Sequence, residues 1–218
     1  MEKNNNGKMV AIVALVVAVV ALSVGFAAFA DDLTIDGTAT VESKNEFDDD
    51  TATNGLHYQA NSNKCYLTSD STAKTAIVGA DVGTLSTDAW SGISIPLGDS
   101  ANSITCEAVV ENLTSYTAYL KSLASNKGLT CTSSGANKTT NEGNVCAATT
   151  MTVKIGSVAT DTITVTNAAA NNNTTSGTIA AEGGTALVTV TVEYTGAQTD
   201  EDVTITLPTI THHYSSAQ

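Results

Sequence analysis

Apolar and polar residues alternate one for one in several segments of the chain. The clearest is TALVTVTVEY, residues 185–194, in which nearly every second residue is apolar and the intervening ones are mostly threonine or glutamate. Residues 151–155 and 162–166 alternate in the same way. Because successive side chains of a strand point to opposite faces, each segment would present one apolar and one polar face. This pattern is typical of antiparallel strands that have one face in solvent.

Turn-rich stretches such as NAAANNNTTSG and EGG separate the alternating segments. This arrangement predicts an all-β fold, an antiparallel β-sandwich of the jelly-roll or Ig-like type, behind an N-terminal hydrophobic signal or anchor helix. No hinge rich in proline, glycine and serine interrupts the later part of the chain. We therefore expect residues 1–30 to be a signal peptide or membrane anchor and residues 31–218 to form a single sandwich domain.

The last alternating segment changes phase. In DVTITLPTITHHY, residues 202–214, the apolar positions move from odd to even numbers at Pro208. A shift by one residue would turn the apolar face outward, and proline cannot donate a ladder hydrogen bond. The sequence therefore predicts a bulge or a break at this point.

Two regions are harder to assign. Residues 112–128 place Tyr116, Tyr119, Leu120 and Leu123 at helical spacing, but they could also continue a strand from SITCEAVV. Between residues 42 and 97 we expect short strands at KCYLT, TAIVGA and GISIPL, separated by loops.

Residues 1–30 have the composition of a targeting segment. Two lysines precede residues 9–30, which are 22 uncharged residues, and the small residues Ala28 and Ala30 stand directly before Asp31. This spacing predicts cleavage by signal peptidase after Ala30. The alternatives are an uncleaved membrane anchor, because a run of this length can span a bilayer, and a pilin-type segment cut near Gly7. With either a signal peptide or an anchor, the rest of the chain is exported.

A further alternating segment begins directly behind the predicted cleavage site. Leu33, Ile35, Ala39 and Val41 would share one face, with threonine and aspartate between them. Gly37 lies in the middle of this segment and weakens it as an isolated strand. The segment therefore needs a partner strand, either in its own domain or in a neighbouring subunit.

The chain is acidic, with a net charge of −13, and all nine of its basic residues are lysines. A surface of this kind repels phosphate backbones, so we expect no binding to nucleic acid. The densest acidic run, EFDDD at residues 46–50, lacks the glycine and the final glutamate of a twelve-residue calcium loop. We expect this run to be a solvated loop.

The four cysteines favour disulfides, because an exported chain with an even number of cysteines usually pairs them. Cys131 and Cys146 flank a polar loop, so we predict that these two are bonded and that Cys65 pairs with Cys106 by elimination. The rival interpretation is a zinc site, but no CxxC spacing occurs and the histidines lie far away in sequence.

Motifs for catalysis or cofactor binding are absent: the sequence contains no GxSxG, Walker loop, GxGxxG or HExxH. His57 stands alone, and the neighbours His212 and His213 would point to opposite faces of a strand, which does not suit chelation of one metal. We therefore predict no enzyme activity, no cofactor and no metal site. Trp90, the only tryptophan, is either a core residue or an exposed platform for a ligand.

Three phrases carry a resemblance to a known family. They are VGFAAFADDLTIDGTATV, the central VVENLTSYTAYLKSL, and the C-terminal GTIAAEGGTALVTVTVEYTGAQTDEDVTITLPTITHHYSSAQ. The chain resembles the exported Firmicutes proteins with SipW-type signal peptides, the group around the TasA and camelysin biofilm-matrix proteins. The resemblance implies a secreted, jelly-roll-like sandwich and assembly into fibres, in which the N-terminal segment of one subunit completes the sheet of the next. Residues 31–41 would be that donor segment.

The leading hypothesis is an exported structural protein of the cell surface or extracellular matrix, a fibre subunit that assembles by strand addition through residues 31–41. Its partners would be other copies of itself or other surface proteins. The alternative is a monomeric, surface-anchored binding module of the adhesin type, in contact with the membrane only through residues 9–30. A secreted hydrolase is a third hypothesis, and the absent motifs argue against it.

Overall fold

The computed structural model of the chain describes residues 55–97, 103–197 and 202–216. Within these ranges, fourteen strands form two antiparallel sheets, accompanied by one α-helix and one short 3-10 helix. The predicted cleavage site, the predicted donor segment and the acidic run at residues 46–50 lie outside the described residues. The residues predicted for the cleavage site are Ala28, Ala30 and Asp31, and those predicted for the donor segment are Leu33, Ile35, Ala39 and Val41.

The first sheet has six strands, two of which share one edge position. In spatial order they are β1 (Leu56–Tyr58) and β2 (Lys64–Leu67), then β5 (Ser103–Asn112), β12 (Gly184–Tyr194), β8 (Thr149–Ile155) and β9 (Thr162–Val165). Both β1 and β2 pair with β5, one after the other along its length. The longest strand, β12, lies in the middle of this sheet.

The second sheet has eight strands. β3 (Asp81–Leu85) pairs with β4 (Ala89–Leu97), and the other edge of β4 pairs with both β13 (Val203–Thr206) and β14 (Ile210–Ser215). Beyond them, β7 (Thr130–Ser133) pairs with β13 and β6 (Ala118–Ser125) pairs with β14. The short strands β10 (Asn171–Asn172) and β11 (Thr178–Ile179) pair with β6. The 3-10 helix η1 (Thr68–Asp70) follows β2, and the helix α2 (Lys138–Ala147) follows β7.

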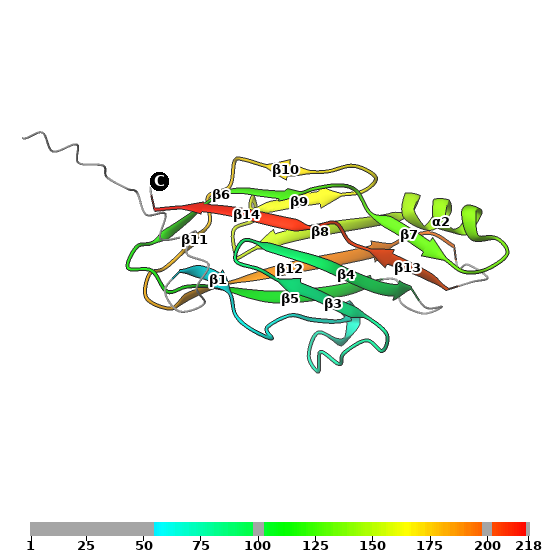
Figure 1. The fold of residues 1–218 in the computed structure, drawn as a ribbon, viewed down its shortest axis with the longest axis horizontal. Helices are drawn as coiled ribbons and strands as arrows, with labels where there is room; N and C mark the ends of the chain where they lie inside the picture. The colour runs from blue at the N-terminus through cyan, green and yellow to red at the C-terminus, as the bar shows by residue number, and fades with distance from the viewer. Residues whose placement is uncertain (1–54, 98–102, 198–201, 217–218) are drawn as a thin grey trace, which may run out of the picture. The chain divides into compact units, whose positions relative to one another are not determined.

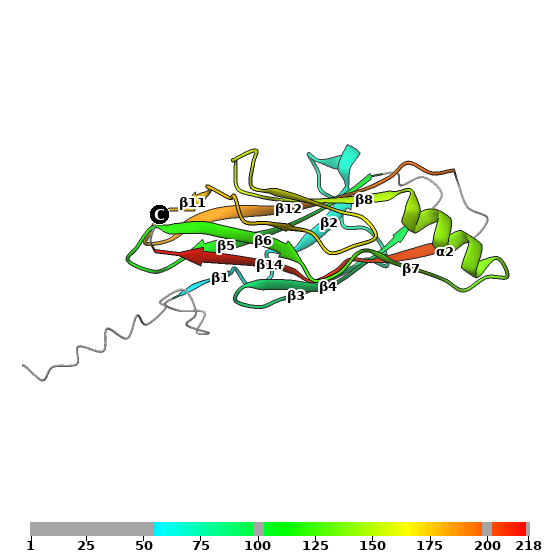
Figure 2. The same cartoon turned by 90° about the horizontal axis from the view of Figure 1, so that it is seen from above.

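The strand pairs are nested in the sequence. β4 pairs with β13 and β14, β5 with β12, β6 with β10 and β11, and β8 with β9. The pairs alternate between the two sheets, so the chain crosses from one layer to the other between successive pairs (Figure 1). Figure 2 shows β8 and β12 in one layer above β3, β4 and β14 in the other. The result is a β-sandwich-like fold with one hydrophobic core.

The core is built from the alternating positions that the sequence indicates. In β12, every second residue from Ala186 to Tyr194 is buried, as predicted, and in β8 Met151, Val153 and Ile155 are buried. Strands β2, β4 and β9 also confirm predicted segments. The TAIVGA prediction is wrong: this segment forms only one bridge, between Tyr66 and Ala76.

The predicted break at Pro208 is confirmed. β13 ends at Thr206 and β14 begins at Ile210, and in the three residues between them the Leu207 N–H donates to Ile93 O at 2.9 Å. Leu207 and Ile210 are both buried although their numbers differ in parity. The break thus absorbs the phase change and keeps both halves of the segment facing the core.

Two elements differ from the sequence prediction. The helical interpretation of residues 116–123 is wrong, because this region forms strand β6. The helix that does occur, α2, lies within the stretch expected to be a polar loop, between Cys131 and Cys146. Val145 is the only buried residue of α2.

Candidate functional site

Both predicted disulfides are present. Cys65 and Cys106 lie directly opposite each other on the neighbouring strands β2 and β5, and both are buried. Cys131 in β7 is bonded to Cys146 in the last turn of α2. The first disulfide holds an edge strand onto the first sheet, and the second holds α2 onto the second sheet.

Trp90 is not an exposed platform. Its side chain is fully buried, its indole Nε1 donates to Val82 O at 2.8 Å, and its ring lies edge-on to Tyr58 with centroids 6.4 Å apart. Because the indole N–H has a partner and the ring faces the core, the structure corrects the platform hypothesis in favour of a core role.

The outer edge of β2 is covered by the loop that follows it. Ile77 N donates to Cys65 O at 3.3 Å, which occupies part of this edge. The loop is held down by Lys74, whose Nζ donates to both carboxylate oxygens of Glu107 at 2.9 and 2.7 Å. Burial would raise the pKa of Glu107, but hydrogen bonds from Lys74 and the Tyr66 hydroxyl outweigh it, so this pKa lies below its usual value. The ion pair thus keeps the edge covered.

Two other edge strands are blocked by side chains or by neighbouring backbone. At β3, Asn63 Nδ2 donates to Val82 O and Gly83 O at 3.1 and 2.9 Å. At β9, Asn172 Nδ2 donates to Thr162 O at 3.1 Å, and the Leu129 N–H donates to Thr166 O at 2.8 Å. The groups that donate to these carbonyls lie where the backbone of an incoming strand would have to lie, so these edges are protected against further pairing.

Beside the beginning of β12, no described strand completes the first sheet. β8 pairs with β12 only from Val188 onward, because β8 ends at Ile155 and Gly156, with φ of +65°, turns the chain away. The Gly156 N–H makes a last bond to Leu187 O at 2.8 Å. We call the vacant position beside residues 184–187 the β12 slot.

Backbone groups of β12 face this slot. In an antiparallel ladder, residues alternate between the two neighbouring strands, and here Thr185 and Leu187 point away from β5. Among the described residues, no partner exists for the N–H and C=O of Thr185 or for the N–H of Leu187. Leu56 and Tyr58 on the three-residue strand β1 also turn backbone groups outward without partners among the described residues. The β12 slot and the edge of β1 thus present backbone groups with which another strand could pair.

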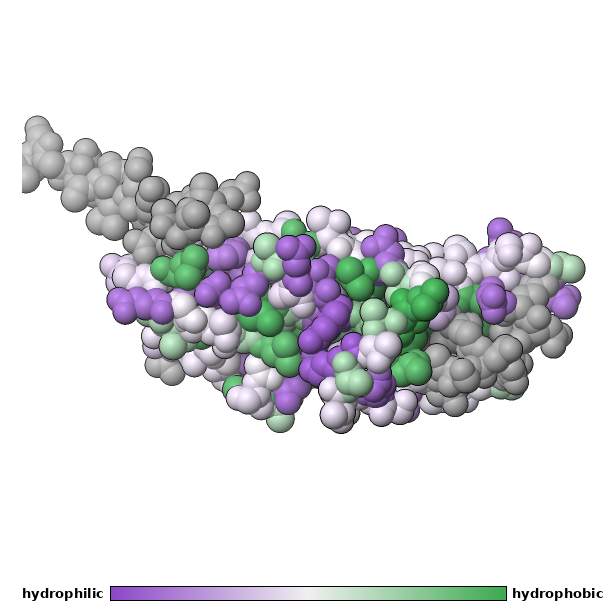
Figure 3. Space-filling model, turned by 90° about the horizontal axis from the view of Figure 1, so that it is seen from below, coloured by the Kyte–Doolittle hydropathy of each residue, from purple (hydrophilic) through white to green (hydrophobic). Residues whose placement is uncertain are grey.

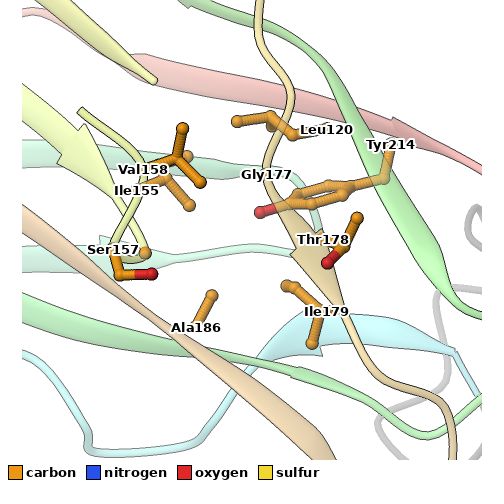
Figure 4. A pocket seen from close by; sticks show the side chains of 10 residues that line it. Leu120, Ile155, Ser157, Val158, Gly177, Thr178, Ile179, Ala186 and Tyr214 are labelled. Atoms are coloured by element: carbon orange, nitrogen blue, oxygen red, sulfur yellow. The ribbon is translucent and has the colours of Figure 1, made fainter. Parts of the chain in front are cut away.

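A cavity of about 90 Å³ lies beside the slot, between the two sheets (Figure 4). Its wall is mostly aliphatic, with side chains from both sheets and from the turn after β8: Leu120, Ile155, Val158, Ile179 and Ala186. The Tyr214 hydroxyl points into it and has no hydrogen-bond partner among the described residues. The exposed residue Ser157 lies at its rim. A wall of aliphatic side chains with the hydroxyls of Ser157, Thr178 and Tyr214 suits a small, mainly apolar guest.

A row of aromatic side chains leads from this cavity to β1. The His212 ring lies 5.3 Å from the Tyr214 ring and 5.1 Å from the Tyr58 ring, measured between centroids. His212 is buried and His213 is exposed, as predicted. Among the described residues, neither ring nitrogen of His212 has a hydrogen-bond partner. Burial lowers the pKa of His212 to about 4, so its ring is neutral at pH 7.

The buried ring makes stability depend on pH. Between pH 6.5 and about 4, the unfolded chain binds a proton on His212 that the folded protein does not, so stability is lost as the pH falls through this window. The full difference corresponds to about 3 kcal/mol. We expect His212→Phe to remove this part of the pH dependence, measured by urea unfolding at pH 7 and at pH 4. His213→Phe is the control and should keep it; parallel pH profiles for the wild type and His212→Phe would contradict the assignment.

Asn112 is a buried clamp that the sequence analysis did not identify. Its Nδ2 group shares its two hydrogens among Tyr116 O, Ile179 O and Ala180 O, at 2.8, 3.2 and 3.1 Å. Its Oδ1 accepts from the N–H and the hydroxyl of Thr114 at 3.1 and 2.7 Å. The clamp fixes the end of β5 to the segment that leads into β12, and so positions the residues beside the slot. The Asn-Leu-Thr phrase at this position was the only available signal.

The described ranges contain no group of three or more His, Cys, Asp or Glu side chains that could hold a metal ion. Nor does any helix in them have the length and apolar character needed to cross a bilayer. On the face drawn in Figure 3, apolar residues form small separate groups among polar ones. No protein-family model matches the chain, and no curated protein matches it.

Proposed function

We propose that the protein is an exported structural protein of the cell surface or extracellular matrix, whose subunits assemble by strand addition through residues 31–41. The observation that carries the proposal is the contrast between the sheet edges. β2, β3 and β9 have backbone groups occupied by other parts of the chain, whereas the β12 slot presents three backbone groups that have no partner among the described residues, beside a cavity. An alternating segment is the kind of chain that such an edge accepts.

Export is supported by two features. The two disulfides fit an oxidising environment outside the cytosol. The N-terminal sequence has lysines before a long uncharged run and small residues before Asp31. The nested strand pairs support a jelly roll rather than an Ig-like sandwich, because a jelly roll is a long hairpin rolled into two sheets.

The monomeric binding module is the alternative. Its natural platform, Trp90, is buried, and the most exposed aromatic residue among the described ones is Tyr116, at 54 %. A single exposed tyrosine gives this alternative less support than the open edge gives to assembly. In both cases we propose no catalytic activity, no cofactor and no affinity for nucleic acid, given the acidic surface and the absent motifs.

Assembly of the chain that begins at Asp31, with both disulfides formed, tests the proposal. We expect polymers by sedimentation and electron microscopy, and we expect Leu33→Thr with Ile35→Thr to leave monomers, because threonine keeps the strand propensity but removes the apolar face. Thr34→Ser with Thr38→Ser, on the opposite face, is the matched control and should assemble normally. A wild-type chain that stays strictly monomeric at all concentrations would refute the proposal.

A further inference from the structure

β8 leaves the first sheet before β12 begins, and a cavity lies at the same place. We propose that the β12 slot is the acceptor site, and that residues 31–41 of a second copy of the chain lie in it with one aliphatic side chain in the cavity. This inference rests on the proposed function, and it adds where the added strand binds and what holds it.

Backbone groups of β12 can pair with a strand that enters the slot. A strand in the slot would continue the line of β8 and would pair with the N–H and C=O of Thr185 and the N–H of Leu187, which have no partners among the described residues. The Gly156 N–H already occupies Leu187 O, so the slot has a defined end at the turn after β8. The added strand is thereby limited in how far it can slide along β12.

The cavity can hold a side chain of the added strand. Side chains of a strand point inward at every second residue, so a strand in the slot directs alternate side chains toward Ile155, Ile179 and Ala186. A cavity of about 150 Å³ with an aliphatic wall is large enough for benzene. The cavity here, about 90 Å³, therefore suits a guest smaller than benzene, such as a branched aliphatic side chain. Leu33, Ile35 and Val41 are the aliphatic side chains of this size on the apolar face of the donor.

A contact of this kind can propagate from copy to copy. The donor segment and the slot are different surfaces, so a contact between two copies leaves one slot and one donor free. Such a head-to-tail contact adds further copies in the same way, and it extends into a filament when its rotation does not close a ring. The occupant of the slot is therefore a second copy of the chain, and insertion of a chain's own segment is an outcome of the test.

Three variants of the chain from Asp31 test the site. Ser157→Phe places a ring over the cavity rim from an exposed position, and Ala186→Leu fills the cavity from within. Ala159→Phe is the matched control, because Ala159 is equally exposed in the same turn and does not line the cavity. We expect the first two to raise the critical concentration for assembly about tenfold or more, and the control to leave it unchanged. Circular dichroism of the dilute proteins verifies folding, and Ser157→Phe keeps the test valid if Ala186→Leu does not fold.

The outcomes distinguish a failure of the proposed acceptor site from a failure of the proposed function. If Ser157→Phe assembles like the wild type while Leu33→Thr with Ile35→Thr does not assemble, strand addition stands and the acceptor lies elsewhere, at β1 for example. If the Leu33 and Ile35 variant assembles normally, the proposed function itself fails. If the Thr185 amide is already protected from hydrogen exchange in dilute monomer, the chain's own segment fills the slot and the inference is overturned.

Discussion

Replacing Asn112 by alanine is expected to lower the free energy of unfolding by about 4 kcal/mol. The side chain makes five hydrogen bonds, three to carbonyl oxygens and two to Thr114, and it is fully buried. Alanine would leave these groups without partners in a site that water does not reach, and each unsatisfied group costs about 1–3 kcal/mol. Thr114 can still bond to Tyr116 O, which keeps the total below the sum of separate losses.

Urea unfolding at neutral pH measures this effect. Asn173→Ala is the matched control, because Asn173 is exposed, and its replacement is expected to change stability by less than about 0.5 kcal/mol. Asn112→Asp should cost more than alanine, because a carboxylate would then face three carbonyl oxygens. A cost below about 1 kcal/mol for Asn112→Ala would show that the clamp does not hold β5 to β12.

Removing the disulfide between Cys65 and Cys106 is expected to destabilise the protein by about 4 kcal/mol. The bond joins residues 41 apart in sequence, and in the loop-entropy model a longer closed loop gives a larger stabilisation. It also holds β2, and with it the loop that covers the β2 edge, against β5. Its loss would therefore release an edge as well as reduce stability.

The second disulfide provides the comparison. Cys131 and Cys146 are 15 residues apart, so replacing both by alanine is expected to cost about 3 kcal/mol. Denaturant unfolding of the two double-alanine variants, each with the other disulfide intact, shows directly which disulfide contributes more to stability. A larger loss for the variant at Cys131 and Cys146 would contradict the larger stabilisation expected from the longer closed loop.

The strands with regular alternation were predictable because the burial of one face alone determines their sequence pattern. β8, β9 and β12 have one face in the core, so their apolar positions appear at every second residue. The break at Pro208 was predictable for the same reason, because an uncompensated change of phase would expose one half of the segment. Where buried and exposed side chains alternate with the pleat of the sheet, the sequence alone is sufficient to predict a strand.

β6 shows why a regular rule can mislead. Its pairing with β14 skips Lys121: His213 lies opposite Ser122, and Tyr214 lies opposite Leu120. This bulge turns both Leu120 and Leu123 toward the core, although they are three residues apart. Three is also a helical spacing, so a bulged strand and an amphipathic helix have the same local pattern in the sequence. Only the partner strand distinguishes them.

The helix α2 and the β12 slot could not be predicted from local pattern. α2 buries only Val145, so it shows no apolar periodicity, and its position depends on the disulfide from Cys146. The slot depends on where β8 ends relative to the first residue of β12, which is a matter of register between distant segments. Periodicity identifies strands, but it does not reveal how far each one extends beside its neighbour.

Hydrogen exchange of residues 31–41 tests the central claim of strand addition most directly. The chain from Asp31 would be measured by mass spectrometry in the dilute and in the assembled state. The account predicts fast exchange in dilute solution and exchange slower by at least roughly 100-fold after assembly, because each amide that joins a ladder is protected. Residues 31–41 that exchange fast in both states, or that are already protected in dilute monomer, would contradict it.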